Sequence, residues 1–255
     1  HMRNISREIF VFFFILSWAS PTWSAPILYD WAFNVNGVLY TSPDIYSPPD
    51  AGQLPGYFDY SGFDWETGLG TISIIYNPGE AGDYYFLSFF DHEIDEGFNW
   101  FDNEFGAYVG TPDIGQTWEI DEPGYGTPYE DSYYYGDIFW NLETGNLDNM
   151  YFYDSFYGDS LTEYEYPISD DVSFALGWNF SLTEGEMAVI KLFLEEQVSS
   201  DFYLSHTDVD SLCTFYFSST LEIYDTNLPV PEPSTMMLIG TGIIVITGLR
   251  KRTKK

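Results

Sequence analysis

Positive charge is scarce in this chain of 255 residues. Lysine and arginine together number 8, against 40 aspartates and glutamates. Outside the two ends, residues 25–230 contain Lys191 as their single cation against 38 acidic side chains, a formal charge of −37. Such a surface repels a phosphate backbone, which excludes nucleic-acid binding. Its self-repulsion has to be relieved by salt or by bound divalent cations.

Cysteine is scarcer still. Cys213 is the only one in the chain, so no disulfide can form within it. Without a disulfide, the apolar core alone must then hold the fold together. Because Cys213 begins a strand-like Thr/Phe/Tyr pattern, we expect a small buried thiol.

Signatures of common catalytic sites are missing. The chain has no GxSxG, HExxH, CxxC or GxxxxGK pattern. Ser205, His206 and Asp208 are close in sequence, but neighbouring residues of a strand point to opposite faces, so Ser205 and His206 cannot form a nucleophile–base pair there. Paired carboxylates, which glycosidases require, arise by chance in so acidic a chain. The sequence therefore predicts a protein that is not an enzyme, with a glycosidase or polysaccharide lyase as the least favoured alternative.

Helical periodicity of useful length is absent between residues 25 and 228. Short runs of β-branched and aromatic residues, separated by Gly, Pro, Asn and Asp, take its place. This pattern predicts an all-β fold, here a single antiparallel, jelly-roll-like β-sandwich over residues 25–228. The expected strands are Tyr29–Val35, Gly70–Tyr76, Tyr84–Phe90, Gln116–Ile120, Met150–Tyr153, Val172–Phe180, Ala188–Leu194, Phe202–Ser205 and Cys213–Tyr224.

The clearest β-pattern covers residues 172–194. Alternate side chains from Val172 to Leu182 are apolar, and so are alternate side chains from Ala188 to Leu194, with a turn around Gly185 between the two runs. We expect the runs to pair as antiparallel neighbours that bury both apolar faces and leave Lys191 pointing outward.

Residues 2–24 have the three parts of a secretory signal peptide. Two arginines precede the apolar run Ile9–Trp18, and small residues at Thr22 and Ser24 favour cleavage before Ala25. The alternatives are an N-terminal core strand and a membrane anchor. We expect cleavage between Ser24 and Ala25, and export of the remainder.

Residues 229–255 have a different three-part order. A Pro-Glu-Pro strip, which proline keeps extended, precedes an uncharged stretch at 234–249 and the basic run RKRTKK. As a helix that stretch spans about 24 Å at ~1.5 Å per residue, less than the ~30 Å bilayer core. The cations favour a cytoplasmic end. A buried core helix and a permanent anchor are alternatives to the transmembrane helix and transient tether that we expect.

This order resembles the PEP-CTERM sorting signal of exported bacterial proteins: VPEPST (230–235), MMLIGTGIIVITGL (236–249) and RKR (250–252). The resemblance implies handling by an exosortase-type membrane protease and delivery to the cell surface or the exopolysaccharide matrix. It also assigns two roles by position. The recognition element is Pro231, Glu232 and Pro233, and the stop-transfer cluster is Arg250, Lys251 and Arg252.

Two acidic segments are candidate cation sites, because each places carboxylates at alternate positions. Clustered carboxylate oxygens suit Ca²⁺, which takes 6–8 oxygen ligands. Gly97 falls one position late for an EF-hand loop, and solvated acids at a strand end are the alternative for each segment. The candidate ligands are Asp91, Glu93, Asp95 and Glu96 in the first segment, and Asp208 and Asp210 in the second.

The sequence therefore predicts an exported, non-catalytic structural or adhesive protein of the cell surface or the exopolysaccharide matrix. The alternative is a calcium-assisted carbohydrate-binding module. In that reading, tyrosines such as Tyr133–Tyr135 stack on sugar rings; core and edge-strand positions are the other explanation for them.

Overall fold

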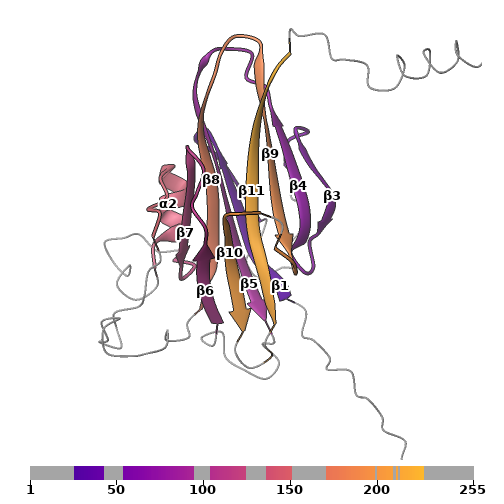
Figure 1. Cartoon of the computed structure of the whole chain (residues 1–255), viewed down its shortest axis with the longest axis vertical. Helices are drawn as coiled ribbons and strands as arrows, with labels where there is room; N and C mark the ends of the chain where they lie inside the picture. The colour runs from indigo at the N-terminus through magenta and orange to yellow at the C-terminus, as the bar shows by residue number, and fades with distance from the viewer. Residues whose placement is uncertain are drawn as a thin grey trace, which may run out of the picture.

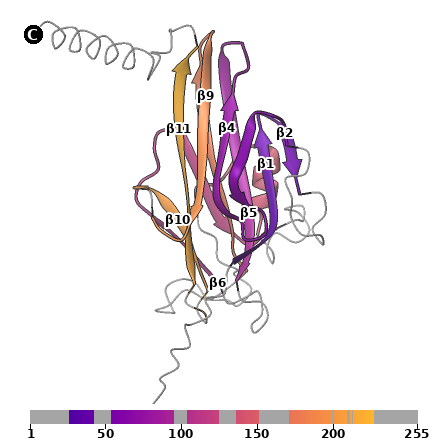
Figure 2. The same cartoon turned by 90° about the vertical axis from the view of Figure 1, so that its right-hand side faces the viewer.

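A computed structural model of the chain describes residues 26–42, 54–94, 104–124, 136–150, 171–198, 200–208, 211 and 213–226. Two antiparallel sheets lie face to face, with one short helix on the outside, as Figure 1 shows from the side and Figure 2 after a quarter turn. No helix among these residues is long and apolar enough to cross a membrane. The predicted signal peptide, its cleavage residues Ser24 and Ala25, and the predicted sorting signal lie outside the described residues.

The first sheet has five strands in the order β2-β1-β5-β8-β7. β1 (Pro26–Val35) and β2 (Val38–Thr41) form a hairpin through Asn36 and Gly37. The φ angles of these two residues, 50° and 87°, suit the tight turn that twisted strands favour. The remaining strands are β5 (Gly82–Ile94), β7 (Gln116–Asp121) and β8 (Ser173–Leu182).

The second sheet has six strands in the order β3-β4-β9-β11-β10-β6. In this sheet β9 lies between β4 and β11 and pairs antiparallel with both of them. The strands are β3 (Phe58–Asp64), β4 (Leu69–Tyr76), β6 (Glu104–Val109), β9 (Glu186–Glu195), β10 (Tyr203–Asp208) and β11 (Thr214–Asp225).

Aromatic and aliphatic side chains from both sheets fill the space between them. Phe33 of β1 lies 5.1 Å from Phe58 of β3 between ring centroids, and Phe90 of β5 meets Phe217 of β11 edge-on at 5.3 Å. Burying a side chain of this size contributes about 1.5–3 kcal/mol. This shared core confirms the predicted all-β architecture of two antiparallel layers, and it supplies the stability that the chain cannot take from a disulfide within itself.

The strands within residues 172–194 form where the pattern predicts them, but their predicted pairing with one another is wrong. β8 pairs with β5 and β7, whereas β9 pairs with β4 and β11 of the other sheet. The turn at Glu184 and Gly185 therefore carries the chain from one sheet to the other. The two apolar faces meet across the core rather than lying side by side, and Lys191 points away from the core as expected.

A short helix, α2 (Ile138–Thr144), covers the outer face of the five-stranded sheet. Ile138 and Leu142 pack against Phe89 and Ala175 on that face, so the middle of β8 is buried on both sides. The helix ends at Gly145, whose φ of 83° is the left-handed cap that glycine favours. Seven residues are too few for helical periodicity to predict, and the sequence reading missed this element.

The sandwich has two distinct ends. At the upper end of Figure 1 the turns at residues 77–81 and 183–185 meet the last residues of β11. At the lower end β5 and β7 finish beside the start of β8, and β10 finishes beside the start of β11. Of the expected strand Met150–Tyr153, Met150 is not in a strand and the rest lies outside the described residues.

Candidate functional site

A row of polar side chains crosses the lower end of the five-stranded sheet. In the strand register Asp30 of β1 lies beside Asp91 of β5, Asp91 beside Ser173 of β8, and Ser173 beside Asp121 of β7. Neighbouring strands are ~4.8 Å apart, so the row brings three carboxylates to one stripe of the sheet. All four residues are at most 3 % exposed. Alternate residues of a strand share a face, so Asp91 and Ser173 lie on the same outer face of the sheet as Phe89 and Ala175, which α2 covers.

Three carboxylates at one side of the row form what we call the Asp91 cluster: Asp91, Glu93 and Asp171. One oxygen of each lies within 4.8 Å of the others. Asp91 and Glu93 are buried, and Asp171 is half-buried. Burial, followed by the charges of Asp171, Glu93, Glu104 and Asp30, raises the pKa of Asp91 well above its usual value. Carboxylates that are buried close together cannot all stay ionised without a counter-charge. One of them therefore keeps a proton, or the site binds a cation instead.

The Asp91 cluster contains two of the six predicted cation ligands, Asp91 and Glu93. Its third member, Asp171, was not predicted, because it is 78 positions beyond Glu93 in sequence and comes alongside only through the pairing of β5 with β8. The predicted ligands Asp95, Glu96 and Asp210 lie outside the described residues.

Asp208, the remaining predicted ligand, lies in the other sheet. It ends β10 opposite Glu104 of β6, and its Oδ1 accepts a hydrogen bond of 2.5 Å from the Ser211 amide. Neither group of clustered acids found among the described residues includes it. The structure therefore does not join the two predicted segments into one site there.

A second group, the Glu119 cluster, consists of Glu119, Asp121 and Asp137 at the start of α2. Oε1 of Glu119 accepts from the Asn141 amide group at 2.9 Å, and Oδ2 of Asp121 accepts from the Asp137 backbone N–H at 2.8 Å. Burial raises the pKa of Glu119 and of Asp121 to about 8 each, against the lowering effect of these hydrogen bonds. The cluster attaches α2 to β7.

The sequence reading missed the Glu119 cluster. The alternation of Glu119 and Asp121 was the one available signal, since it places both carboxylates on the same face of β7. In so acidic a chain that spacing is not distinctive. What makes the pair unusual is its burial under α2, which depends on a helix that the sequence pattern did not predict.

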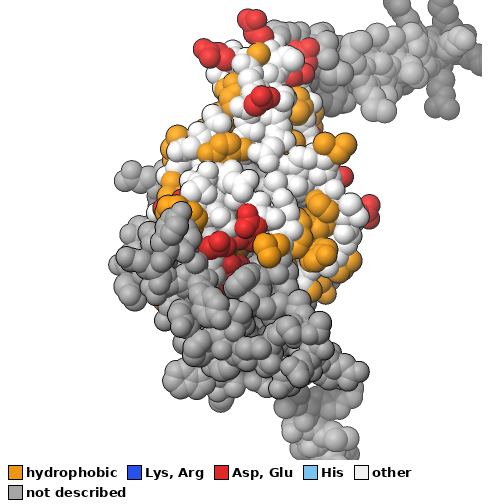
Figure 3. Space-filling view, turned by 90° about the vertical axis from the view of Figure 1, so that its left-hand side faces the viewer, with side chains coloured by type: hydrophobic (Ala, Val, Ile, Leu, Met, Phe, Trp, Pro, Cys, Tyr) orange, Lys and Arg blue, Asp and Glu red, His pale blue; other side chains and the backbone are white. Residues whose placement is uncertain are grey.

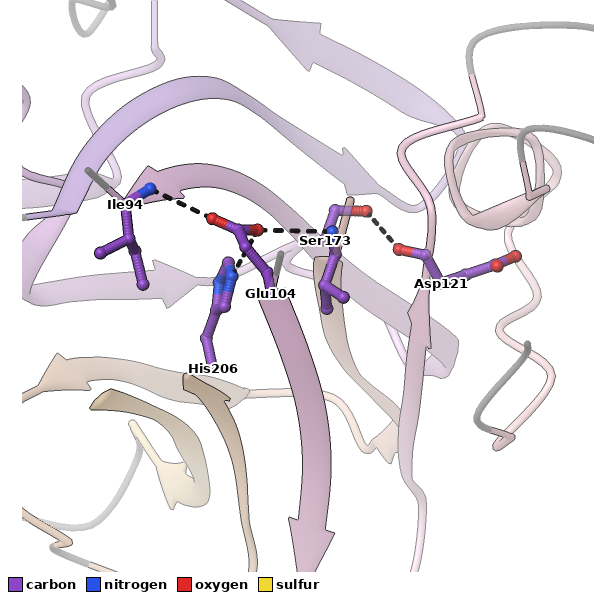
Figure 4. Close-up of polar contacts among 6 residues, drawn as sticks. Ile94, Glu104, Asp121, Ser173 and His206 are labelled. Carbon is purple, nitrogen blue, oxygen red and sulfur yellow. Dashed lines mark hydrogen bonds and ion pairs between the residues drawn. The ribbon is translucent and has the colours of Figure 1, made fainter. Parts of the chain in front are cut away.

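A third polar group lies between the two sheets at the lower end. Glu104 begins β6, and its carboxylate accepts from the Ile94 amide at 3.1 Å and from the Val172 amide at 3.5 Å, so it connects the second sheet to β5 and to the residue before β8. His206 of β10 places its Nε2 2.6 Å from Oε2 of the same carboxylate. Figure 4 shows these contacts converging on Glu104.

Both described histidines are fully buried. Burial lowers the pKa of His206 to about 3, although Asp208 acts in the opposite direction, and burial followed by the nearness of His206 lowers that of His92 to about 3. The rings are therefore uncharged at neutral pH. Phe215 lies 4.6 Å from His92 and 5.1 Å from His206 between ring centroids. These contacts are those of core histidines.

Two smaller predictions are confirmed. Ser205 is half-buried and its hydroxyl bonds the Ala107 carbonyl, while His206 faces the core, so the two side chains do point to opposite faces of β10. Cys213 is 6 % exposed, and burial, followed by the charges of Glu196 and Asp208, raises the pKa of its thiol.

Comparison with known proteins adds information on one segment. The family model of the PEP-CTERM protein-sorting motif matches residues 229–252. No curated protein and no solved structure matches the chain. The motif implies an exported protein that exosortase, a membrane enzyme, processes and that reaches the cell surface. The chain is a PEP-CTERM domain-containing protein.

Proposed function

We propose that this protein is a non-enzymatic structural or adhesive β-sandwich, displayed at the cell surface or in the exopolysaccharide matrix. The observation that carries the proposal is the position of the sorting motif. It begins at residue 229, three positions after the last described residue of the sandwich, Thr226. In this proposal residues 229–255 are a transient membrane tether, and the sandwich is the part that the cell displays.

The described acid–base groups support a non-enzymatic role. A catalytic histidine must touch its substrate, but the His92 and His206 side chains are wholly inaccessible between the sheets. Glu104, the carboxylate partner of His206, is itself 1 % exposed and bonds backbone amides of the opposite sheet. These groups hold the layers together, which is a structural task.

Sorting is tested by changing the tail of the full chain in a host that carries the protease. We expect Glu232→Ala, or deletion of the basic residues 250–252, to leave unprocessed or mislocalised protein, detected by immunoblot of membrane and surface fractions. Normal maturation of either variant would contradict the roles assigned to Glu232 and to the basic cluster.

We also propose that the Asp91 cluster takes up Ca²⁺. Each of its three carboxylates brings one hard oxygen to within 4.8 Å of the others, and water supplies further ligands of an ion that prefers 6–8. The described residues contain no cation except Lys191, which lies in the other sheet. Protons are the competing way to neutralise the cluster, so uptake of Ca²⁺ strengthens as pH rises.

Titration of the full chain in detergent with CaCl₂ tests this site. At a Ca²⁺ concentration about 100 times the Kd, we expect a gain of about 2.7 kcal/mol in unfolding free energy. Asp91→Asn should abolish the gain, whereas Glu143→Gln, an exposed carboxylate on α2, should keep it. An equal gain in all three proteins would show that Ca²⁺ acts through the net charge and not through the cluster.

The alternative of a calcium-assisted carbohydrate-binding module predicts a further response. Calorimetry of the same chain, with Ca²⁺ present, against neutral and acidic glycans would give heat of binding for the module and a flat trace for a structural protein. The tyrosines that motivate this alternative, Tyr133–Tyr135, lie outside the described residues.

A further inference from the structure

The upper end of the sandwich is where the chain leaves for its sorting motif. Asp225, the last residue of β11, pairs with Glu186 at the start of β9. Thr226 then donates from its backbone N–H and from its hydroxyl to the Gly185 carbonyl, at 2.7 and 2.6 Å. The exit point of the folded body is therefore fixed against the turn at residues 183–185.

The length of chain beyond this point limits where a processing enzyme can lie. Pro231 follows Thr226 by five residues and Glu232 by six. At ~3.3–3.6 Å per residue the span from Thr226 to Glu232 cannot exceed about 22 Å. A globular domain of about 100 residues already has a radius of gyration of about 13 Å. An enzyme that holds Glu232 in a groove therefore reaches the upper end of the sandwich.

β11 offers this neighbour an open edge. β10 pairs with β11 only from Thr214 to Phe217, whereas β9 pairs with it from Tyr216 to Asp225. Among the described strands, the upper half of β11 thus has a partner on one side only. Such an edge accepts an added strand through its backbone groups, and this one leads directly into the motif.

The charge of the upper end restricts the partner further. Glu80, Asp83 and Glu184 are exposed there, and Figure 3 shows acidic side chains gathered at the top of the sandwich. No lysine or arginine of the described residues lies at this end, since Lys191 is five positions inside β9 from Glu186. A facing surface of the same sign would be repelled, and a basic surface is favoured.

We propose that the upper end of the sandwich is a docking surface for the sorting protease, which meets it with a basic patch beside its active-site groove. The surface consists of the turns at residues 77–81 and 183–185 and the open edge of β11. It rests on the proposed sorting by exosortase. The short connection makes the contact intramolecular once the motif is bound, so even a weak patch has a high effective concentration.

The rate of tail removal in cells, followed by pulse-chase of the full chain, tests the docking surface. The variant E80Q/E184Q removes two charges at the upper end, and the control E143Q/E196Q removes two exposed charges elsewhere. We expect the first to slow processing about three- to tenfold and the second to change it by less than about twofold. Equal rates for both, or equal slowing by both, would overturn the proposal.

A linker variant separates docking from obstruction. A Gly-Ser insertion of about twelve residues after Thr226 raises the average span from Thr226 to Glu232 by about 10 Å and its maximum by about 40 Å. The protease can then hold Glu232 without contacting the sandwich, while both partners stay intact. Docking predicts slower processing, and the E80Q/E184Q change should then lose its effect. Unchanged or faster processing would show that the sandwich does not assist the protease. Glu232→Ala serves as reference: if it matures normally, the proposed sorting fails and docking loses its premise, whereas blocked maturation of Glu232→Ala with equal rates for the two charge variants overturns the docking surface alone.

Discussion

Among the described residues, buried carboxylates occur only toward the lower end of the sandwich. At the upper end Glu80, Asp83 and Glu184 are exposed, whereas at the lower end Asp91 and Glu104 are each 1 % exposed. An exposed carboxylate keeps its hydration, but a buried one needs donors, a proton or a cation. A formal charge of −37 for residues 25–230 therefore says little about where charge is costly. The free-energy cost of charge is concentrated in the few carboxylates that are buried toward the lower end.

The strongest test of this contrast is Glu104→Ala. The substitution removes the acceptor of the Ile94 and Val172 amides and the partner of His206, and it leaves these groups buried. Because His206 is uncharged, these groups are unpaired donors and not charges, so we expect each of them to cost about 1–3 kcal/mol in unfolding free energy, measured by urea unfolding of the full chain with tryptophan fluorescence.

Glu104→Gln is the matched control for shape. It keeps one acceptor oxygen and the length of the side chain, so it should lose less than the alanine variant. If Glu104→Ala costs under about 1 kcal/mol, the carboxylate does not connect the two sheets in the way that its contacts indicate.

The sequence predicts which face of a strand is buried, but it does not predict which strands pair. Alternation placed Phe174, Leu176 and Ile190 in the core correctly, because burial of one strand face follows from period two alone. Pairing between β8 and β9 was predicted wrongly, since a tight turn can join strands within a sheet or carry the chain across to the facing one. The periodicity of both strands is the same in either arrangement.

The candidate site was harder to predict for a related reason. Asp91 and Glu93 were recognised by their spacing, but Asp171 joins them only through the pairing of β5 with β8. Glu104 and His206 meet through the pairing of β6 with β10 at the lower end. Contacts between residues so far apart in sequence depend on the strand order, which composition and local pattern do not fix.

A second test concerns the pH dependence of the lower end. In the folded chain Glu119 and Asp121 have pKa values of about 8, whereas unfolded carboxyls titrate near pH 4. The folded chain therefore binds more protons than the unfolded chain between these values, and its stability falls as pH rises through that window. The buried histidines act oppositely, but only between about pH 3 and 6.5, where the unfolded rings gain protons.

Asp121→Asn isolates one of the two carboxyls. Between pH 6.5 and 8, in the presence of EDTA, we expect the fall in unfolding free energy to become shallower by up to about 1.4 kcal/mol per pH unit, the slope of one proton. Unfolding curves at four pH values measure this difference. An unchanged slope would mean that Asp121 is already ionised in the folded chain at neutral pH.

The smallest expected effect is that of Glu184→Gln at the upper end. The side chain is exposed in the turn between β8 and β9, so its charge is hydrated in both the folded and the unfolded chain. We expect a change in unfolding free energy within about 0.5 kcal/mol, the usual range for surface substitutions. The alternative is that repulsion among all the acidic side chains, and not burial, destabilises the fold. Removing one negative charge would then stabilise the fold to a similar degree at either end. Measuring Glu184→Gln beside Asp121→Asn at pH 8 decides between the two: equal gains indicate general repulsion, and a gain confined to Asp121→Asn indicates that burial at the lower end sets the cost.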